Sequence, residues 1–149
     1  GNPIELTVEN GVATVFINRP ERKNALSVAA ANGLADAWDL IEADVNIRVV
    51  ILTSADCGVF SAGLDLKEAT EIARDEGVDI LSRMRDPFHG RMRACSKPII
   101  SAMTGSLMAG GMMLTLMSVL RVGLKGTRVV DVAATDSDGD CPDRGSDAN

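Results

Sequence analysis

Two short apolar segments, each followed by a glycine-containing turn, constrain the fold of this chain more than any other feature. Residues 49–53 read Val-Val-Ile-Leu-Thr, and residues 98–103 form a second run without a charge. Continuous apolar runs of this length are typical of strands that are buried on both faces of a sheet. Helical patterns follow the turns after both runs. We therefore predict an α/β fold in which helices connect the buried strands.

The beginning of the chain carries clear turn and capping signals. Residues 4–9 and 12–18 have the pattern of strands, and the Asn-Gly pair at 10–11 between them is the strongest short signal for a β-hairpin. A helix is expected to begin near Ser27, a favourable N-cap residue. One apolar face of this helix should contain Leu34, Trp38, Ile41 and Val45.

The middle of the chain predicts further short elements. We expect a loop over residues 54–63, and then a helix that is capped by Asp65 and Glu68 and ends near Gly77. A later helical segment should be broken at Pro87; its apolar residues are Leu81, Met84, Phe88 and Met92. Residues 105–109 are expected to form a loop, residues 110–117 a helix, and residues 120–123 a short strand.

The charge of the chain is concentrated at its C-terminal end. The formal net charge is −6, and residues 131–149 hold six Asp and one Arg. A negative chain lacks the basic face that nucleic acids require, so a nucleic-acid partner is not expected. Residues 131–149 also contain no Leu, Ile, Met or aromatic residue. We predict a folded core over residues 1–130 and a disordered acidic tail over residues 131–149.

Cysteine, histidine and aspartate patterns indicate neither a disulfide framework nor a metal site. Three cysteines lie far apart, and none is in CxxC spacing. Residues 136–147 place Asp at four positions of a calcium loop, but the required Gly and Glu are replaced. His89, the only histidine, follows Pro87 among several arginines and is expected to be a surface residue.

The N-terminal residues carry no signal-peptide pattern, and we expect a cytoplasmic protein. Residues 98–120 form a stretch of 23 uncharged residues, long enough to span a membrane. Pro98, the turn at residues 104–106 and the Gly pair at 110–111 interrupt this stretch. These breaks favour a strand, a turn and a buried helix, and no membrane partner is expected, although a membrane-associated protein is kept as an alternative.

Three motifs resemble, in order, those of the enoyl-CoA hydratase/isomerase (crotonase) family. Residues 9–27 resemble the opening hairpin and loop of the family, and residues 60–66, Phe-Ser-Ala-Gly-Leu-Asp-Leu, resemble its first oxyanion loop. Residues 97–102 and 105–111 resemble the second oxyanion loop. The resemblance covers about residues 3–129, roughly the first half of a typical member. It implies a partial crotonase-like spiral of ββα units, assembled as a homotrimer or hexamer when the full-length chain is present.

The resemblance also implies a site for an acyl-CoA thioester, as in fatty acid metabolism. Family members polarise the thioester carbonyl between two backbone N–H groups, and the matching positions are Ala62 and Gly110. Residues that would line the path of coenzyme A are Lys23, Ala25, Leu26, Gly63, Leu64 and Asp65. From the residues alone, Lys23 could equally be a solvated loop charge, and Asp65 is better explained as a helix cap than as a catalytic acid. No separate cofactor is implied, since coenzyme A is part of the substrate.

The chain departs from the family at its catalytic acids. Hydratases of the family use two glutamates, and Met113 occupies the position of the first. A thioether cannot act as a general base. No glutamate follows Glu76, so none is present for the second position. We therefore keep two functions open, an enoyl-CoA hydratase/isomerase-type enzyme and a non-catalytic acyl-CoA-binding or assembly subunit. The change of composition after Val129 further suggests a truncated or frame-shifted reading.

Overall fold

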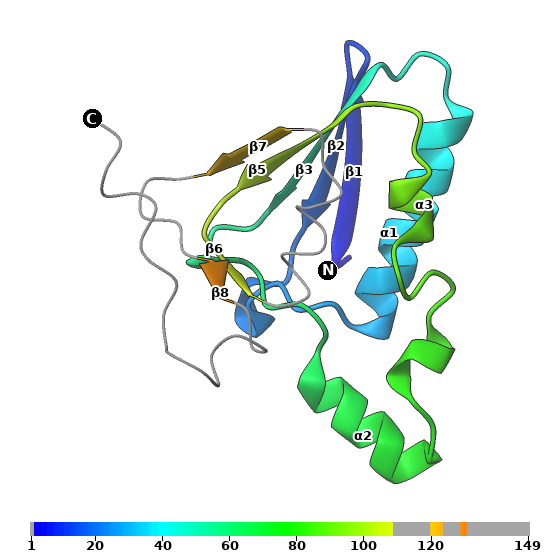
Figure 1. Cartoon of the computed structure of the whole chain (residues 1–149), viewed down its shortest axis with the longest axis vertical. Helices are drawn as coiled ribbons and strands as arrows, with labels where there is room; N and C mark the ends of the chain where they lie inside the picture. Colours follow the sequence, from blue (N-terminus) through cyan, green and yellow to red (C-terminus); the bar gives the residue numbers. More distant parts are fainter. Residues whose placement is uncertain (1, 109–119, 124–128, 131–149) are drawn as a thin grey trace.

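A computed structural model of the chain describes residues 2–108, 120–123 and 129–130. Its larger sheet has the strand order β1-β2-β3-β5-β7. The strands are β1 (Ile4–Glu9), β2 (Val12–Ile17), β3 (Val49–Ser54), β5 (Ile99–Met103) and β7 (Leu120–Gly123). β1 is antiparallel to β2, and the remaining pairs are parallel (Figure 1). This confirms the predicted α/β fold.

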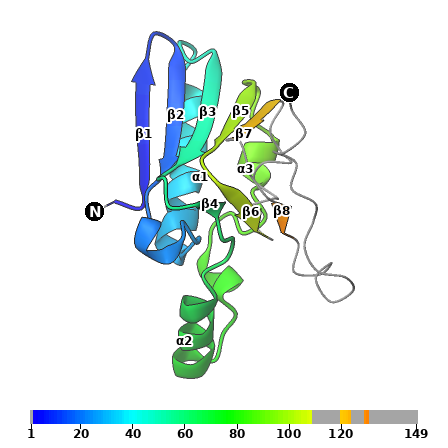
Figure 2. The same ribbon diagram turned by 90° about the vertical axis from the view of Figure 1, so that its left-hand side faces the viewer.

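A second, smaller sheet lies at the end of the larger one where α2 begins (Figure 2). It contains β4 (Val59–Ser61), β6 (Ser106–Met108) and β8 (Val129–Val130), with β6 in the middle. Both pairs are parallel. β4 and β6 fall in segments predicted to be loops, so those two predictions were wrong. Each strand has three residues and begins close to a glycine, too short a pattern to separate from a loop.

Helices cover one face of the larger sheet. α1 (Val28–Ala43) packs along this face, and the short helix α3 (Gly90–Arg93) lies beside it (Figure 1). α2 (Leu66–Glu76) extends away from the sheet and has no buried residue. Two 3-10 turns complete the described part, η1 (Pro20–Arg22) and η2 (Ile80–Arg83).

The hairpin and the first helix were predicted correctly, apart from the helix end. Asn10 and Gly11 have φ angles of 51° and 79°, as the turn requires. The Ser27 side chain accepts a hydrogen bond of 3.0 Å from the Ala30 N–H and caps α1. The predicted core residues Leu34, Trp38 and Ile41 are buried. Val45, however, is 90% exposed, because α1 ends at Ala43 and the chain leaves the helix at an extended Asp44.

The segment after α2 forms two short turns of helix in place of one broken helix. Met84 and Met92 are buried as expected, whereas Phe88 is 59% exposed. His89 has a φ of 55° at the N-cap of α3 and is half-buried. The predicted helix over residues 110–117 and the acidic tail over residues 131–149 lie outside the described residues.

The main core lies between α1 and the larger sheet. Strand residues that point toward α1 are buried, among them Ala13, Val15, Val50 and Leu52. They alternate with half-buried residues on the opposite face, as the pleat of a strand requires. A second cluster joins α1 to α2 and η2; it consists of Ala31, Ile80 and Met84, with Leu64 and Ile72 packed against it.

The uncharged stretch that raised the membrane alternative contains β5 and β6 in its first half. Among the helices that the structure describes, none has the length and apolar character needed to cross a bilayer. The same part of the chain holds no cluster of three or more potential metal ligands. Cys57 and Cys95 are both free thiols.

Candidate functional site: the glycine turn after β4

The two glycine-containing motifs include parts of neighbouring parallel strands, β4 and β6. Val59 of β4 pairs with Ser106 of β6, and the Ser106 N–H donates a hydrogen bond of 3.1 Å to the Gly58 carbonyl. Gly105 permits this approach, since a Cβ atom there would lie 2.5 Å from the backbone carbon of Gly58. Parallel neighbours end at the same edge of a sheet, so the C-terminal ends of β4 and β6 lie side by side. Gly110 follows β6 but lies outside the described residues.

The first turn is fixed by main-chain pairing with the loop before α1. Leu26 and Leu64 form an isolated parallel bridge. In this bridge the Leu26 N–H donates to the Gly63 carbonyl at 2.7 Å, and the Asp65 N–H donates to the Leu26 carbonyl at 3.0 Å. Gly63 itself has a φ of 81°, which favours glycine at this position. Main-chain hydrogen bonds therefore join the turn to the loop before α1.

The Ala62 N–H is already occupied. It donates a hydrogen bond of 3.0 Å to the Lys23 carbonyl. A backbone N–H has a single hydrogen and cannot serve both this carbonyl and a thioester oxygen well. This hydrogen bond argues against the predicted role of Ala62 as an oxyanion donor.

The Leu64 N–H, unlike the Ala62 N–H, has no acceptor among the described residues. The N–H groups on either side of it are hydrogen-bonded. The Gly63 N–H donates to the Ser61 hydroxyl at 3.1 Å, and the Asp65 N–H donates to the Leu26 carbonyl. The Leu64 N–H itself donates to no residue in the described part of the chain. Successive N–H groups of an extended segment point in opposite directions, so this donor faces away from Leu26. Leu64 therefore offers the free donor of this turn.

The loop that holds the turn is organised by Asn24. This side chain is fully buried, and its amide donates to the carbonyls of Ala55 at 2.9 Å and Val59 at 3.1 Å. Its oxygen accepts from the Arg19 N–H at 3.0 Å. The Asn24 carbonyl accepts from the Ser61 hydroxyl at 2.8 Å. Asn24 thus joins the chain after β2 to the first and last residues of β4 and to Ala55 before it.

Asp65 joins the same loop to the start of α2. Its carboxylate accepts from the Glu68 N–H at 3.1 Å, from Arg19 at 3.1 Å and from Arg22 at 3.0 Å. Burial alone would raise the pKa of the Asp65 carboxyl, but the hydrogen bonds from Glu68, Arg22 and Arg19 outweigh it and lower the pKa. Asp65 is therefore a helix cap and an ionised anchor, and the preferred interpretation of its role as a cap is confirmed.

The other predicted substrate-binding residues lie in this region. Lys23 is exposed in a left-handed conformation with a φ of 54°, while Ala25 and Leu26 are buried. The role of the Lys23 charge toward coenzyme A stays a prediction. His89 lies at α3, on the helix-covered side of the larger sheet; burial and Arg93 lower its pKa, although Asp86 opposes the shift.

Comparison with known proteins identifies the family. The sequence profile of enoyl-CoA hydratase/isomerase matches residues 7–123. A putative enoyl-CoA hydratase of Thermus thermophilus is 44% identical over 114 residues, which are 73% of this chain and 44% of that protein. The (E)-benzylidenesuccinyl-CoA hydratase of Thauera aromatica is 34% identical over 120 residues, which are 80% of this chain and 46% of that protein. The chain therefore belongs to the enoyl-CoA hydratase/isomerase family.

Solved structures agree with this assignment. An enoyl-CoA hydratase/carnithine racemase from Magnetospirillum magneticum has 31% sequence identity and a TM-score of 0.78, covering 95% of this chain and 54% of that one. An enoyl-CoA hydratase from Mycobacterium tuberculosis has 34% identity and a TM-score of 0.73. The chain thus spans about half the length of the relatives that it matches.

Sequence reasoning missed several residues that build the site. The interactions of Arg19, Arg22 and Asn24 were not predicted, although all three lie in the segment that carries the family resemblance. Their partners Asp65 and Ala55 are 31 to 46 residues away in sequence, so spacing gave no sign of these contacts. The Leu64 N–H, which has no acceptor among the described residues, was identified only from the hydrogen bonds of the Leu26–Leu64 bridge.

Proposed function

We propose that this chain forms the acyl-CoA-binding half of an enoyl-CoA hydratase/isomerase-type protein. The Leu64 N–H would donate to the thioester oxygen, with the Gly110 N–H as the second donor. The observation that carries the proposal is the Leu64 N–H, which has no acceptor among the described residues and lies in a turn held by main-chain hydrogen bonds. Each such donor stabilises the charge that develops on an acyl oxygen by roughly 2.7–4 kcal/mol.

Binding is tested by following two neighbouring amides in one experiment. Amide NMR shifts of Leu64 and Ala62 would be recorded while crotonyl-CoA is added to the 149-residue chain. We expect the Leu64 resonance to move, because its N–H gains an acceptor, and the Ala62 resonance to move little, because Lys23 already holds it. Free coenzyme A, which lacks the thioester oxygen, is the matched control. Movement of Ala62 with Leu64 unmoved would refute the proposed donor.

Whether the chain hydrates a bound thioester depends on its acid–base groups. Met113 stands where the resemblance places the first glutamate, and no glutamate follows Glu76. Loss of one general acid–base group typically lowers a rate by about 10²–10⁴-fold. We propose that the chain binds and polarises a thioester without hydrating it at the usual rate, which makes a non-catalytic acyl-CoA-binding or assembly subunit the second candidate.

A crotonyl-CoA hydration assay separates these candidates. Turnover at about 1–10³ per second, typical of enzymes, would show that an aspartate has taken over the proton transfer. Thioester binding without turnover would support the binding subunit. Met113→Glu should restore little, since the second glutamate would remain absent.

A further inference from the structure

The outer edge of β1 presents backbone groups that no described residue pairs with. β1 is the terminal strand of the larger sheet. The Asn18 N–H donates to the Pro3 carbonyl at 2.8 Å, and the β1–β2 register alternates from that pair. The peptide groups of Leu6 and Val8 therefore point away from β2. Within the described residues, these groups have no hydrogen-bonding partner.

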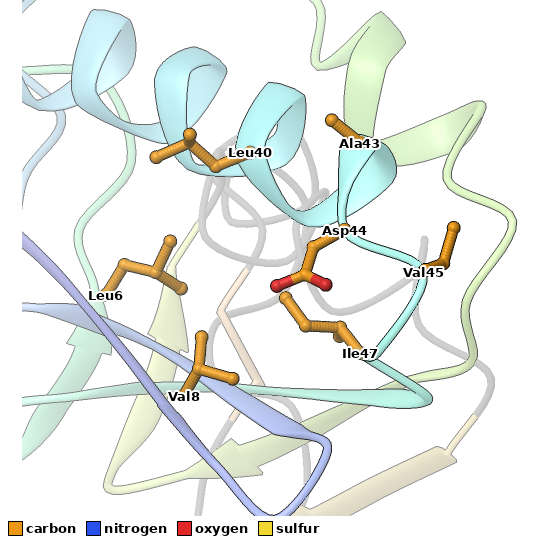
Figure 3. Close-up of a pocket in the computed structure, with 7 residues that line it drawn as sticks. All are labelled: Leu6, Val8, Leu40, Ala43, Asp44, Val45 and Ile47. Atoms are coloured by element: carbon orange, nitrogen blue, oxygen red, sulfur yellow. The ribbon is translucent and has the colours of Figure 1, made fainter.

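An apolar hollow lies directly beside this edge. Figure 3 shows its lining, which comes from β1, the end of α1 and the loop before β3. The hollow measures about 500 Å³, and its apolar lining residues are Leu6, Val8, Leu40, Ala43, Val45 and Ile47. Among the large apolar side chains of the described residues, five are exposed, and three of them, Val8, Leu40 and Val45, line this hollow. Such a concentration marks an interaction surface.

Three carboxylates lie around the edge without an ion-pair partner among the described residues. Glu5 and Glu9 are exposed on the face of β1 opposite the hollow, and Asp44 lies at the hollow itself. In the described part of the chain, none of these three forms an ion pair. Asp36 and Asp39 on α1, in contrast, are paired with Arg85 and Arg91.

We propose that the β1 edge binds an extended segment of a partner protein in which apolar residues alternate with Lys or Arg. The backbone of that segment would pair with Leu6 and Val8 and extend the sheet by one strand. Its apolar side chains would enter the hollow, and its basic side chains would lie beside Glu5 and Glu9 on the other face. The alternation in the partner matches the alternation of β1.

The charges argue against a second copy of this chain as the occupant. Antiparallel pairing of two β1 strands centred on Thr7 would place Glu5 of each copy opposite Glu9 of the other, and like charges directly opposite are destabilising. The surface is also separate from the candidate thioester site. That site lies at the N-terminal end of α1 and the hollow at its C-terminal end, about 24 Å apart along the 16-residue helix.

The test uses three synthetic peptides with the 149-residue chain. One alternates Val and Lys, one alternates Val and Glu, and one has the Val and Lys residues segregated into two blocks. Binding is measured by fluorescence anisotropy, and the binding site by hydrogen exchange of the Leu6 and Val8 amides. We expect the alternating Val-Lys peptide alone to bind and to slow exchange at both amides. The segregated peptide controls for charge attraction to the acidic residues 131–149.

Two kinds of variant complete the test. Val8→Lys and Leu40→Lys should each weaken binding at least about tenfold, because a charge replaces an apolar contact. Phe88→Lys, at an exposed apolar residue away from the hollow, is the matched control and should leave binding unchanged. Glu5→Lys combined with Glu9→Lys should transfer the preference to the Val-Glu peptide.

Three results would overturn the proposal. They are binding without slowed exchange at Leu6 and Val8, binding that neither Val8→Lys nor Leu40→Lys weakens, and a dimer in sedimentation that Val8→Lys abolishes. The last result would assign the edge to a second copy. None of these outcomes depends on thioester binding, which is measured separately with crotonyl-CoA.

Discussion

The Asp65 carboxylate accepts a hydrogen bond of 3.1 Å from the Arg19 guanidinium and thereby joins the exit of the hairpin to the start of α2. Asp65 is 3% exposed, and it also caps α2. Removal of one partner from a buried ion pair leaves the other charge uncompensated, which typically costs about 3–5 kcal/mol. We expect Asp65→Ala to lower the free energy of unfolding by about 3 kcal/mol or more, measured by urea denaturation. Asp75→Ala, at an exposed ion pair on α2, should change it by less than about 1 kcal/mol.

The same carboxylate predicts an acid-dependent loss of stability. The pKa of Asp65 is lowered in the folded state, so folding favours the ionised form. Its contribution is fully present above the ordinary pKa of about 3.9 and is lost as the pH falls through the lower folded-state pKa. Asp65→Asn, which cannot ionise, should show a shallower decrease in unfolding free energy below about pH 4. Parallel acid profiles for the two proteins would contradict this assignment.

Lys97 should stabilise the C-terminal end of α1. Its ammonium group donates to the carbonyls of Ile41 at 3.0 Å, Asp44 at 2.6 Å and Ile47 at 2.9 Å. Hydrogen bonds to a charged group contribute about 1.5–3 kcal/mol, and Lys97→Met removes all three at once. A decrease of at least that size is expected in chemical denaturation. Lys67→Met, on the exposed face of α2, is the control and should stay within about 0.5 kcal/mol of the original chain.

Gly105 should be intolerant of any side chain. A Cβ atom there would lie 2.5–2.7 Å from backbone atoms of Gly58 and Val59, which cannot move aside like a flexible side chain. Overpacking of this kind typically costs about 1–3 kcal/mol. Gly105→Ala should therefore lower the melting temperature and also weaken thioester binding, since it separates β4 from β6. Gly77→Ala, where φ is 69° but the space is open, should lower stability without affecting binding.

Local signals allowed much of the fold to be predicted from the sequence. The Asn10-Gly11 turn and the Ser27 cap act on residues near them, so the hairpin and the start of α1 could be read directly. Val45 was placed in the core because its spacing continued the helical pattern, but the extended Asp44 ends that pattern one residue earlier. Periodicity alone does not mark where a helix stops.

The candidate site depended on contacts that no local pattern records. The first motif contains the turn, but the donor proposed within it follows from the Leu26–Leu64 bridge, whose members are 38 residues apart. The bridge uses the Gly63 carbonyl and the Asp65 N–H, which face Leu26, whereas the Leu64 N–H faces the opposite side. β4 and β6 escaped prediction for the same reason, since pairing between distant segments defines them.

At residue 64 the direction of the backbone N–H and the packing of the side chain depend on different contacts. Main-chain bonds among residues 26, 63 and 65 help to orient the N–H of residue 64, whereas the Leu64 side chain packs toward the cluster shared by α1, α2 and η2. Side-chain substitutions at position 64 can therefore change the packing beneath α2 and preserve the direction of the N–H.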